Sequence, residues 1–235
     1  MKITPDQIIL WQWGFVQVNA TLVATWLVML LLVAVSALVT RRLSTGMHMS
    51  RMQNLLEVVV TFLSRQISDV GRQEPAEFIS FIGTLFLFIA VSNLLGVVPG
   101  IDPPTGSLST TTALAVCVFV AVPLYGISRR GVVGYFKSYA KPSILMLPFN
   151  IMGELSRTLA LAVRLFGNMM SGTMIGGILL AVTPLVFPVV MSLFGLLTGL
   201  IQAYIFTILA TVFISAAVEV QTGADPRDSH QDKGE

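Results

Sequence analysis

The chain has 235 residues, of which 54% are hydrophobic and 11% are charged, less than half the charged share of an average soluble domain. Its net charge of +2 gives no basis for binding nucleic acid, and its single cysteine, Cys117, excludes a disulfide within the chain. We expect Cys117 to be a small buried side chain. These values indicate a membrane protein.

Three apolar stretches are long enough to cross a bilayer, which takes about 20 residues of helix. They cover residues 19–40, 78–98 and 109–128. Their mixture of Leu, Val, Ala and Phe does not alternate with polar residues, which favours helices over barrel strands. The sequence therefore predicts an all-α polytopic membrane protein, with residues 1–235 forming one membrane domain.

Residues 51–72, between the first two spans, form an amphipathic segment. Apolar side chains such as Leu56, Val59, Leu63 and Ile67 recur at helical spacing, and most charged residues lie elsewhere around the helix. This pattern is typical of a helix that lies in the membrane interface.

A longer apolar region, residues 143–222, follows the third span. Pro184 and Pro188 divide it into segments 143–182 and 189–222. The proline-free run Phe149–Thr183 has 35 residues, or about 52 Å if it is one helix, whereas the hydrocarbon core is about 30 Å thick. Either both helices are steeply tilted, or each breaks near its glycines.

The basic residues predict the orientation of the chain. Lys and Arg are concentrated in the loops after the first and third spans, and the loop between the second and third spans carries only Asp102. The positive-inside rule places the basic loops in the cytoplasm and the N-terminus outside. The C-terminus is then cytoplasmic if the last region is a hairpin. The lack of a transit-like leader favours a bacterial inner membrane.

Arg164 stands just before a stretch, residues 165–218, that contains no Asp, Glu, Lys, Arg or His. A guanidinium at the centre of a membrane helix costs about 2.5–3.5 kcal/mol on insertion scales. Such a residue usually faces a carboxylate or an ion path. Because this stretch contains no carboxylate, we expect the partner to belong to another chain.

Residues 160–169, ALAVRLFGNM, resemble the signature of subunit a of F-type rotary ATP synthases. Ser92–Gly96 followed by Pro99 and Gly100 is similar to the family's second span, and Gly199–Thr207 is similar to its last helix. The resemblance implies a long tilted membrane hairpin, residues 143–182 and 189–222, that packs on a ring of c subunits. It also implies b-type peripheral stalk subunits, the rest of the F-type complex and the lipid bilayer as partners.

The resemblance implies that Arg164 faces the ion-binding carboxylates of the ring. The chain would form two half-channels that carry protons to and from the ring, coupled to ATP synthesis or hydrolysis. A sodium-translocating rotary ATPase is the alternative. The chain itself is expected to be non-catalytic, with no cofactor or metal, and it has no phosphate loop of the GxxxxGK[ST] type.

Further polar residues are candidates for the ion path. Asn168 lies four residues after Arg164 and shares its face, so it either orients the guanidinium, lines the half-channel or packs helices. Gln202 matches the family glutamine that lies near the Arg across the hairpin. Asn93 either lines the outer half-channel or makes an interhelical hydrogen bond.

Two charges and four glycines complete the candidate site. Arg157 lies two turns before Arg164, with Glu154 three residues earlier, and the two either form an ion pair near the cytoplasmic mouth or shape the inner half-channel. Small residues allow close approach between helices or between a helix and the ring. We assign ring packing to Gly172, Gly176, Gly195 and Gly199.

Two positions depart from the family pattern. Many proton-type members have a titratable residue where this chain has Thr173 and Gly195. A proton path would then run through water held by Asn93, Thr173 and Gln202. A sodium path would also tolerate these residues, because hydroxyl, amide and water oxygens suit a hard cation.

Two other classes of function are alternatives to a rotary ATPase stator. A secondary transporter would show inverted repeats and a carboxylate within its spans, and neither is visible. A structural scaffold would not need Arg164 beside a charge-free region. Substituting Arg164 by Ala separates the three, because only a rotary stator would assemble and yet fail to couple.

Overall fold

The computed structural model describes residues 9–13, 16–41, 51–71, 78–96, 103–139, 146–182 and 187–219. Six α-helices account for nearly all of these residues, so the all-α polytopic fold class is confirmed. The structure adds a small antiparallel hairpin before the first helix, formed by β1 (Ile9–Trp13) and β2 (Val16–Asn19). No element is predicted for this segment from the sequence.

Helix α1 (Ala20–Thr40) covers the first expected span, and α2 (Arg51–Gly71) covers the expected amphipathic segment. Helix α2 is buried at Leu63 and Ile67 and exposes Glu57, Arg65 and Asp69. Its buried side packs on α3 and α6. The apolar stripe read from the sequence is therefore the side that joins α2 to the rest of the chain.

Helices α3 (Ile79–Leu95) and α4 (Leu108–Tyr139) are joined through a buried one-turn 3₁₀ helix, Pro104–Gly106. Helix α4 extends beyond the expected span, and its apolar part ends at Ser128. At Gly131 the backbone leaves helical geometry, with φ of 72° and ψ of 162°. A positive φ is available to glycine at little cost, so the chain changes direction there.

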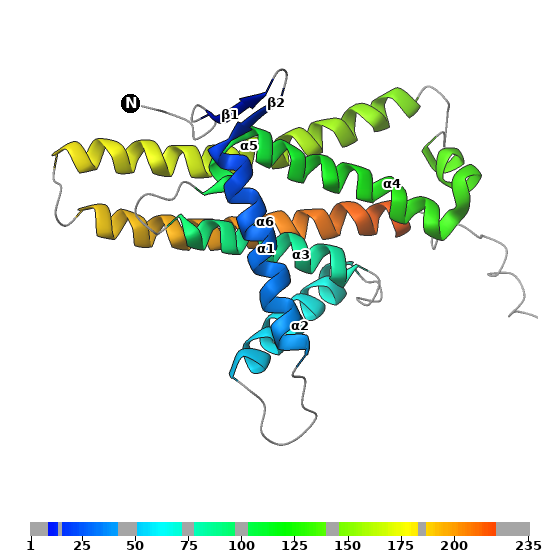
Figure 1. Ribbon diagram of the computed structural model, residues 1–235. Helices are drawn as coiled ribbons and strands as arrows, with labels where there is room; N and C mark the ends of the chain where they lie inside the picture. Colours follow the sequence, from blue (N-terminus) through cyan, green and yellow to red (C-terminus); the bar gives the residue numbers. More distant parts are fainter. Residues whose placement is uncertain are drawn as a thin grey trace, which may run out of the picture.

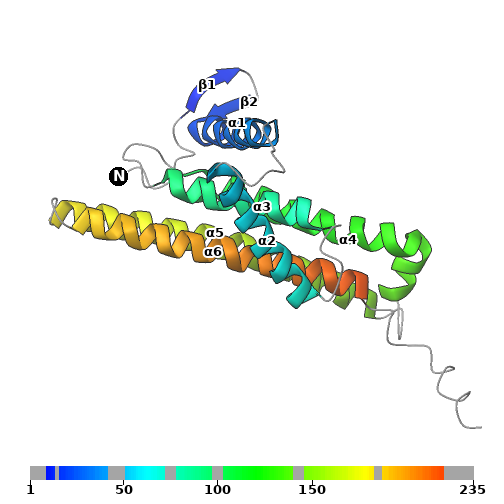
Figure 2. The ribbon, with the colours of Figure 1, turned by 90° about the horizontal axis from the view of Figure 1, so that it is seen from below.

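The long apolar region forms two helices, α5 (Met146–Val182) and α6 (Phe187–Glu219). Each is continuous through its glycines, so the alternative with broken helices is wrong. The 37 residues of α5 give a length of about 55 Å. Figure 1 shows the second half of α5 beside the first half of α6, the two helices diverging toward their other ends, and α1 standing across them. Figure 2, seen from below, views α1 end-on while the hairpin lies in the plane of the picture.

The core lies where α3 and α4 pack on the hairpin. One buried cluster joins five helices, through Val28, Ile89, Ala115, Leu165 and Phe206 among others. A second cluster joins α2, α3, α4 and α6 near Phe78 and Ile214. Together the two clusters connect all six helices.

The outer surface of the bundle is apolar. Trp26, Leu30, Leu124, Phe149 and Leu193 are each about 60–70% exposed. Such a surface suits lipid or other membrane subunits rather than water. Cys117 is exposed on α4, so the expectation that it is buried is wrong. A membrane helix has no need to turn its small apolar residues inward.

Candidate functional site: an exposed arginine and a polar cleft

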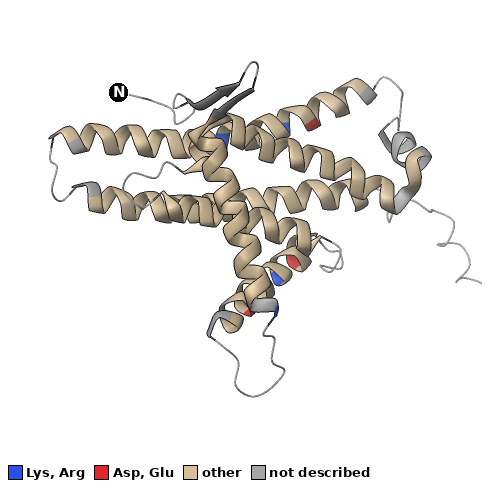
Figure 3. Ribbon diagram, in the orientation of Figure 1, with Lys and Arg blue, Asp and Glu red and all other residues tan. Residues whose placement is uncertain are grey.

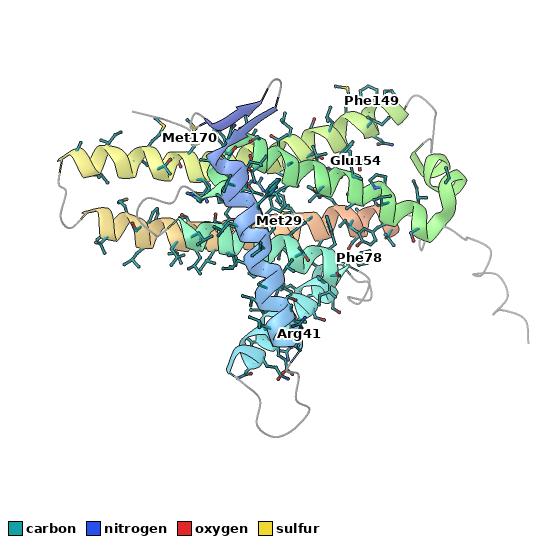
Figure 4. The ribbon with its side chains drawn as sticks, viewed as in Figure 1. Met29, Arg41, Phe78, Phe149, Glu154 and Met170 are labelled. Carbon is teal, nitrogen blue, oxygen red and sulfur yellow. The ribbon has the colours of Figure 1, made fainter. Side chains whose placement is uncertain are left out.

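Charged residues are scarce on the long hairpin. Figure 3 shows blue and red on α2, at the end of α1 and at a few positions of α5. On α5 these are Glu154, Arg157 and Arg164. Figure 4 places Glu154 toward the beginning of α5 and Met170 beyond its middle. The sequence numbers put Arg164 between them, close to the middle of the helix.

Arg164 is exposed, whereas its neighbours Leu161 and Leu165 are fully buried. The core therefore lies on one side of α5, and the guanidinium lies outside it. Ala160 and Gly167, about one turn on either side of Arg164, are small and exposed. A helix of another subunit can approach closely at such a place.

The register of the hairpin is set by a hydrogen bond between its two helices. The Nδ2 of Asn168 donates to the carbonyl of Thr198 at 3.3 Å. Arg164 lies four residues before Asn168, and Gln202 lies four residues after Thr198. Because the helices are antiparallel, Arg164 and Gln202 are at the same level of the hairpin. Arg164 is on its exposed side, and Gln202 is only 5% exposed.

Arg157 lies on the same side of α5 as Arg164. Its guanidinium carbon is 5.7 Å from the ring centroid of Phe213 on α6, which is a cation–π contact. Glu154 is half-buried one turn earlier. The ion pair between Glu154 and Arg157 stays a prediction.

A cleft of about 430 Å³ opens between the C-terminal end of α3, the segment at Pro103 and the hairpin of α5 and α6. It brings together several of the candidate residues, namely Asn93, Asn168, Gly172, Thr173, Gly176 and Gly195. Gln202 is not among the residues that line it. None of the described residues that line the cleft is Asp, Glu or His. Its polar groups are amides, hydroxyls and backbone atoms.

Asn93 is one of the residues that line this cleft. Its Nδ2 donates to the carbonyl of Gly199 at 2.7 Å, and its Oδ1 accepts from the Oγ1 of Thr105 at 2.7 Å. Asn93 is 3% exposed and Thr105 is fully buried. Of the two interpretations of Asn93, the interhelical hydrogen bond is therefore observed, and the residue lines the cleft as well.

The four glycines assigned to ring packing do not share one environment. A Cβ built on Gly172, Gly176 or Gly195 meets nothing within 4 Å, so these three remain open to another subunit. On Gly199 it would lie 3.0 Å from the side chain of Asn93. At Gly199 the close approach that the structure shows is the one between α3 and α6 within the chain.

Some contacts near the site cannot be predicted from the sequence. Thr105 follows two prolines and looks like an ordinary loop residue, yet it supports Asn93. The hydroxyl of Tyr204 donates to the Oε1 of Gln66 at 2.8 Å, which ties α2 to the hairpin. Thr173, a candidate for the path, donates to the Met170 carbonyl at 2.9 Å. Only contacts between distant segments could reveal the first two.

The comparisons with known proteins agree with this arrangement. The family model described as ATP synthase A chain matches residues 22–215. The chain belongs to the ATP synthase A chain family. It is therefore a non-catalytic subunit of F0, works within a larger complex of F0 and F1 subunits, and crosses the membrane several times. The resemblance read from residues 160–169 is confirmed.

Relatives match this F0 subunit over nearly its whole length. It is 59% identical over 217 residues to "ATP synthase subunit a" of Albidiferax ferrireducens, which covers 92% of this chain and 94% of the relative. The identity is 62% over 221 residues with "ATP synthase subunit a 1" of Chlorobaculum tepidum, covering 94% and 100%. It is 60% over 234 residues with "ATP synthase subunit a 2" of Acaryochloris marina, covering 100% of both chains.

Proposed function

We propose that this chain forms the two half-channels that carry protons to and from the carboxylates of a c-subunit ring, coupled to ATP synthesis or hydrolysis. The observation that carries the proposal is the position of Arg164. It is an exposed, permanent cation in the middle of a long apolar hairpin, next to small residues that leave room for a partner. A lipid-facing guanidinium would be costly, so we infer that the ring covers it.

The role of Arg164 follows from electrostatics. At about 4 Å and an effective dielectric of about 20, the attraction between the guanidinium and a ring carboxylate is about 4 kcal/mol. An opposite charge this close lowers the pKa of a carboxylate by about 1–3. Arg164 thus favours release of the proton from the passing ring subunit. The same fixed charge repels cations that would leak directly between the half-channels.

We assign the outer half-channel to the cleft. Asn93, Asn168 and Thr173 line it, and the charge pattern of the loops puts this end of the chain outside. Gln202 lies at the level of Arg164 and is placed at the inner end of this route. Arg157 and Glu154, on the opposite half of α5, are assigned to the mouth of the inner half-channel. Gly172, Gly176 and Gly195 are assigned to ring packing.

Sodium is the second candidate for the transported ion, and one property of the cleft favours it. The described residues that line the cleft have hydroxyl, amide and carbonyl oxygens but no titratable side chain. Oxygen groups of this kind suit a hard cation. A proton, in contrast, would have to pass along bound water.

The arrangement of the helices supports a hairpin that is tilted strongly from the membrane normal. Helix α1 is about one bilayer thickness long and stands across α5 and α6 (Figures 1 and 2). With α1 along the normal, the hairpin is inclined and offers a broad surface to the ring. We place the protein in a bacterial inner membrane, N-terminus outside and C-terminus cytoplasmic, with b-type stalk subunits beside it.

The test uses the purified whole complex in liposomes, with sodium uptake and internal pH followed together during ATP hydrolysis. Arg164→Ala should leave the complex assembled and stop ATP-driven ion uptake. Arg164→Lys should restore little, because an ammonium lacks the planar, always-charged fork. Arg65→Ala, an exposed arginine on α2, is the matched control. Unchanged coupling in Arg164→Ala would refute the proposal.

The same assay identifies the ion. Acidification that a protonophore abolishes, without sodium uptake, means that protons are carried. Sodium uptake that persists or rises with the protonophore means that sodium is carried. A complex that transports without ATP or a ring would point to a secondary transporter instead.

A further inference from the structure

Two buried polar atoms next to the Asn93–Gly199 contact have no hydrogen-bond partner among the described residues. They are the Oγ of Ser92, which is fully buried, and the Nε2 of Gln202, which is 5% exposed. Buried polar groups in proteins are nearly always paired, with protein or with ordered water, because an unpaired group loses its hydration without compensation. The two atoms come from different helices, α3 and α6.

The packing of α3 on α6 fixes the faces from which these side chains project. The helices are antiparallel, because Asn93 bonds Gly199 near one end while Ile82 clusters with Ile214 near the other. Figure 1 shows the same opposite directions of the two ribbons. The amide of Asn93 therefore marks the side of α3 that faces α6, and Gly199 marks the side of α6 that faces α3.

Ser92 and Gln202 turn away from this hydrogen bond in the same direction. Ser92 is one residue earlier on α3, or about 100° around that helix, and Gln202 is three residues later on α6, or about 60° around. In an antiparallel pair these two rotations lead to the same side. That side is where α5 lies, because Thr198 of α6 accepts from Asn168 there. Both side chains thus project into the seam of α3, α5 and α6.

The two residues are also close along the helix axes. Moving from the Asn93–Gly199 contact, Ser92 lies about 1.5 Å and Gln202 about 4.5 Å further in the same direction, so their levels differ by about 3 Å. A hydroxyl and an amide that face one seam with so small an offset along the axes can both reach a single water. Buried waters typically make about three hydrogen bonds, and such a seam can supply them.

We propose that the Oγ of Ser92 and the Nε2 of Gln202 bind one ordered water molecule in the seam of α3, α5 and α6. The chemistry selects water over a cation, because an amide N–H donates a hydrogen bond and cannot be a ligand to a metal ion. Water accepts from the amide and exchanges a hydrogen bond with the hydroxyl. The site needs no titratable residue.

This water would extend the polar route from the cleft toward Arg164. Asn93 and Thr198 line the cleft and adjoin the seam, and Gln202 lies at the level of Arg164. The role in ion access rests on the proposed function of the chain, whereas the presence of the water does not. The two can therefore be tested separately.

The direct test is an electron cryomicroscopy map of the intact complex at a resolution that shows waters. We expect one density peak within hydrogen-bonding distance of Ser92 Oγ and Gln202 Nε2, and its loss in the Ser92→Val complex, where a methyl fills the site. A seam without this peak in the wild type, with Ser92 bonded to its own helix or directly to Gln202, would overturn the proposal.

The functional test compares Ser92→Ala with Ser215→Ala in ATP-driven ion uptake by the reconstituted complex. Ser215 is a second buried serine whose Oγ has no partner among the described residues, and it lies about three and a half turns beyond Gln202 on α6. We expect Ser92→Ala to slow uptake about fivefold, the factor given by one ordinary hydrogen bond, and Ser215→Ala to leave it unchanged. Equal rates for Ser92→Ala and the wild type, or equal losses in both variants, would exclude the role in ion access.

Failure of this inference is distinguishable from failure of the proposed function. If Arg164→Ala remains coupled, the stator assignment is wrong whatever the map shows. If Arg164→Ala is uncoupled and the water is missing, the stator assignment stands and the ion reaches Arg164 by another route.

Discussion

The contact between Gly199 and Asn93 allows one substitution to be predicted in some detail. In Gly199→Ala the new Cβ would lie 3.0 Å from the Cβ and Nδ2 of Asn93 and 3.1 Å from its Cγ. Overpacking of this kind costs about 1–3 kcal/mol. Displacing the Asn93 side chain would also weaken its hydrogen bond to the Gly199 carbonyl, worth about 1 kcal/mol. The better helix propensity of Ala returns about 1 kcal/mol. We therefore expect a net destabilisation of about 1–3 kcal/mol.

The chain provides a matched control for this prediction. Gly195 lies one turn earlier on the same helix, and a Cβ there meets nothing within 4 Å. Gly195→Ala should thus leave the free energy of unfolding unchanged or raise it by up to about 1 kcal/mol. The measurement is the loss of helical circular dichroism of the purified chain in mixed micelles as SDS is added.

A double variant checks the cause. In an Asn93→Ala background, the Nδ2 and Cγ that crowd the new methyl are gone, so adding Gly199→Ala should cost clearly less than it does in the wild type. The reasoning is refuted if Gly199→Ala and Gly195→Ala unfold at the same SDS fraction. It is also refuted if the cost of Gly199→Ala is the same with and without the Asn93 side chain.

Three further predictions concern the hairpin. Tyr204→Phe removes the hydrogen bond to Gln66 and should destabilise the docking of α2 by about 0.5–1.5 kcal/mol, seen as faster amide exchange in residues 51–71; unchanged exchange would contradict it. Phe213→Leu should remove the cation–π contact with the Arg157 guanidinium, worth about 0.5–1 kcal/mol, and slow ion uptake. Phe213→Tyr keeps an aromatic ring and should keep the wild-type rate. Equal uptake rates for Phe213→Leu and the wild type would argue against a role for the contact. Gly195→Glu should speed ATP-driven proton uptake by adding a titratable relay to the cleft, and a rate that stays constant would show that protons do not limit transport there.

The sequence alone determined the class of the protein and singled out one candidate residue, Arg164. Long apolar segments need about 20 residues to cross a bilayer, and this local requirement is visible without any tertiary information. A charge beside a long uncharged stretch is equally visible without the fold. The apolar residues at helical spacing in α2 are visible for the same reason, because the pattern is local.

The tertiary structure decided which polar residues meet. Asn93, Thr105 and Gly199 are far apart in the sequence, and only the packing of α3 on α6 brings them into one buried contact. Gly199 and Gly195 look alike as small residues one turn apart, yet one is buried against Asn93 and the other opens into the cleft. In a membrane helix, apolar residues occur on all sides, so composition does not tell the buried face from the exposed one. The face of each residue depends on its neighbouring helices, and this information lies outside any local stretch of the chain.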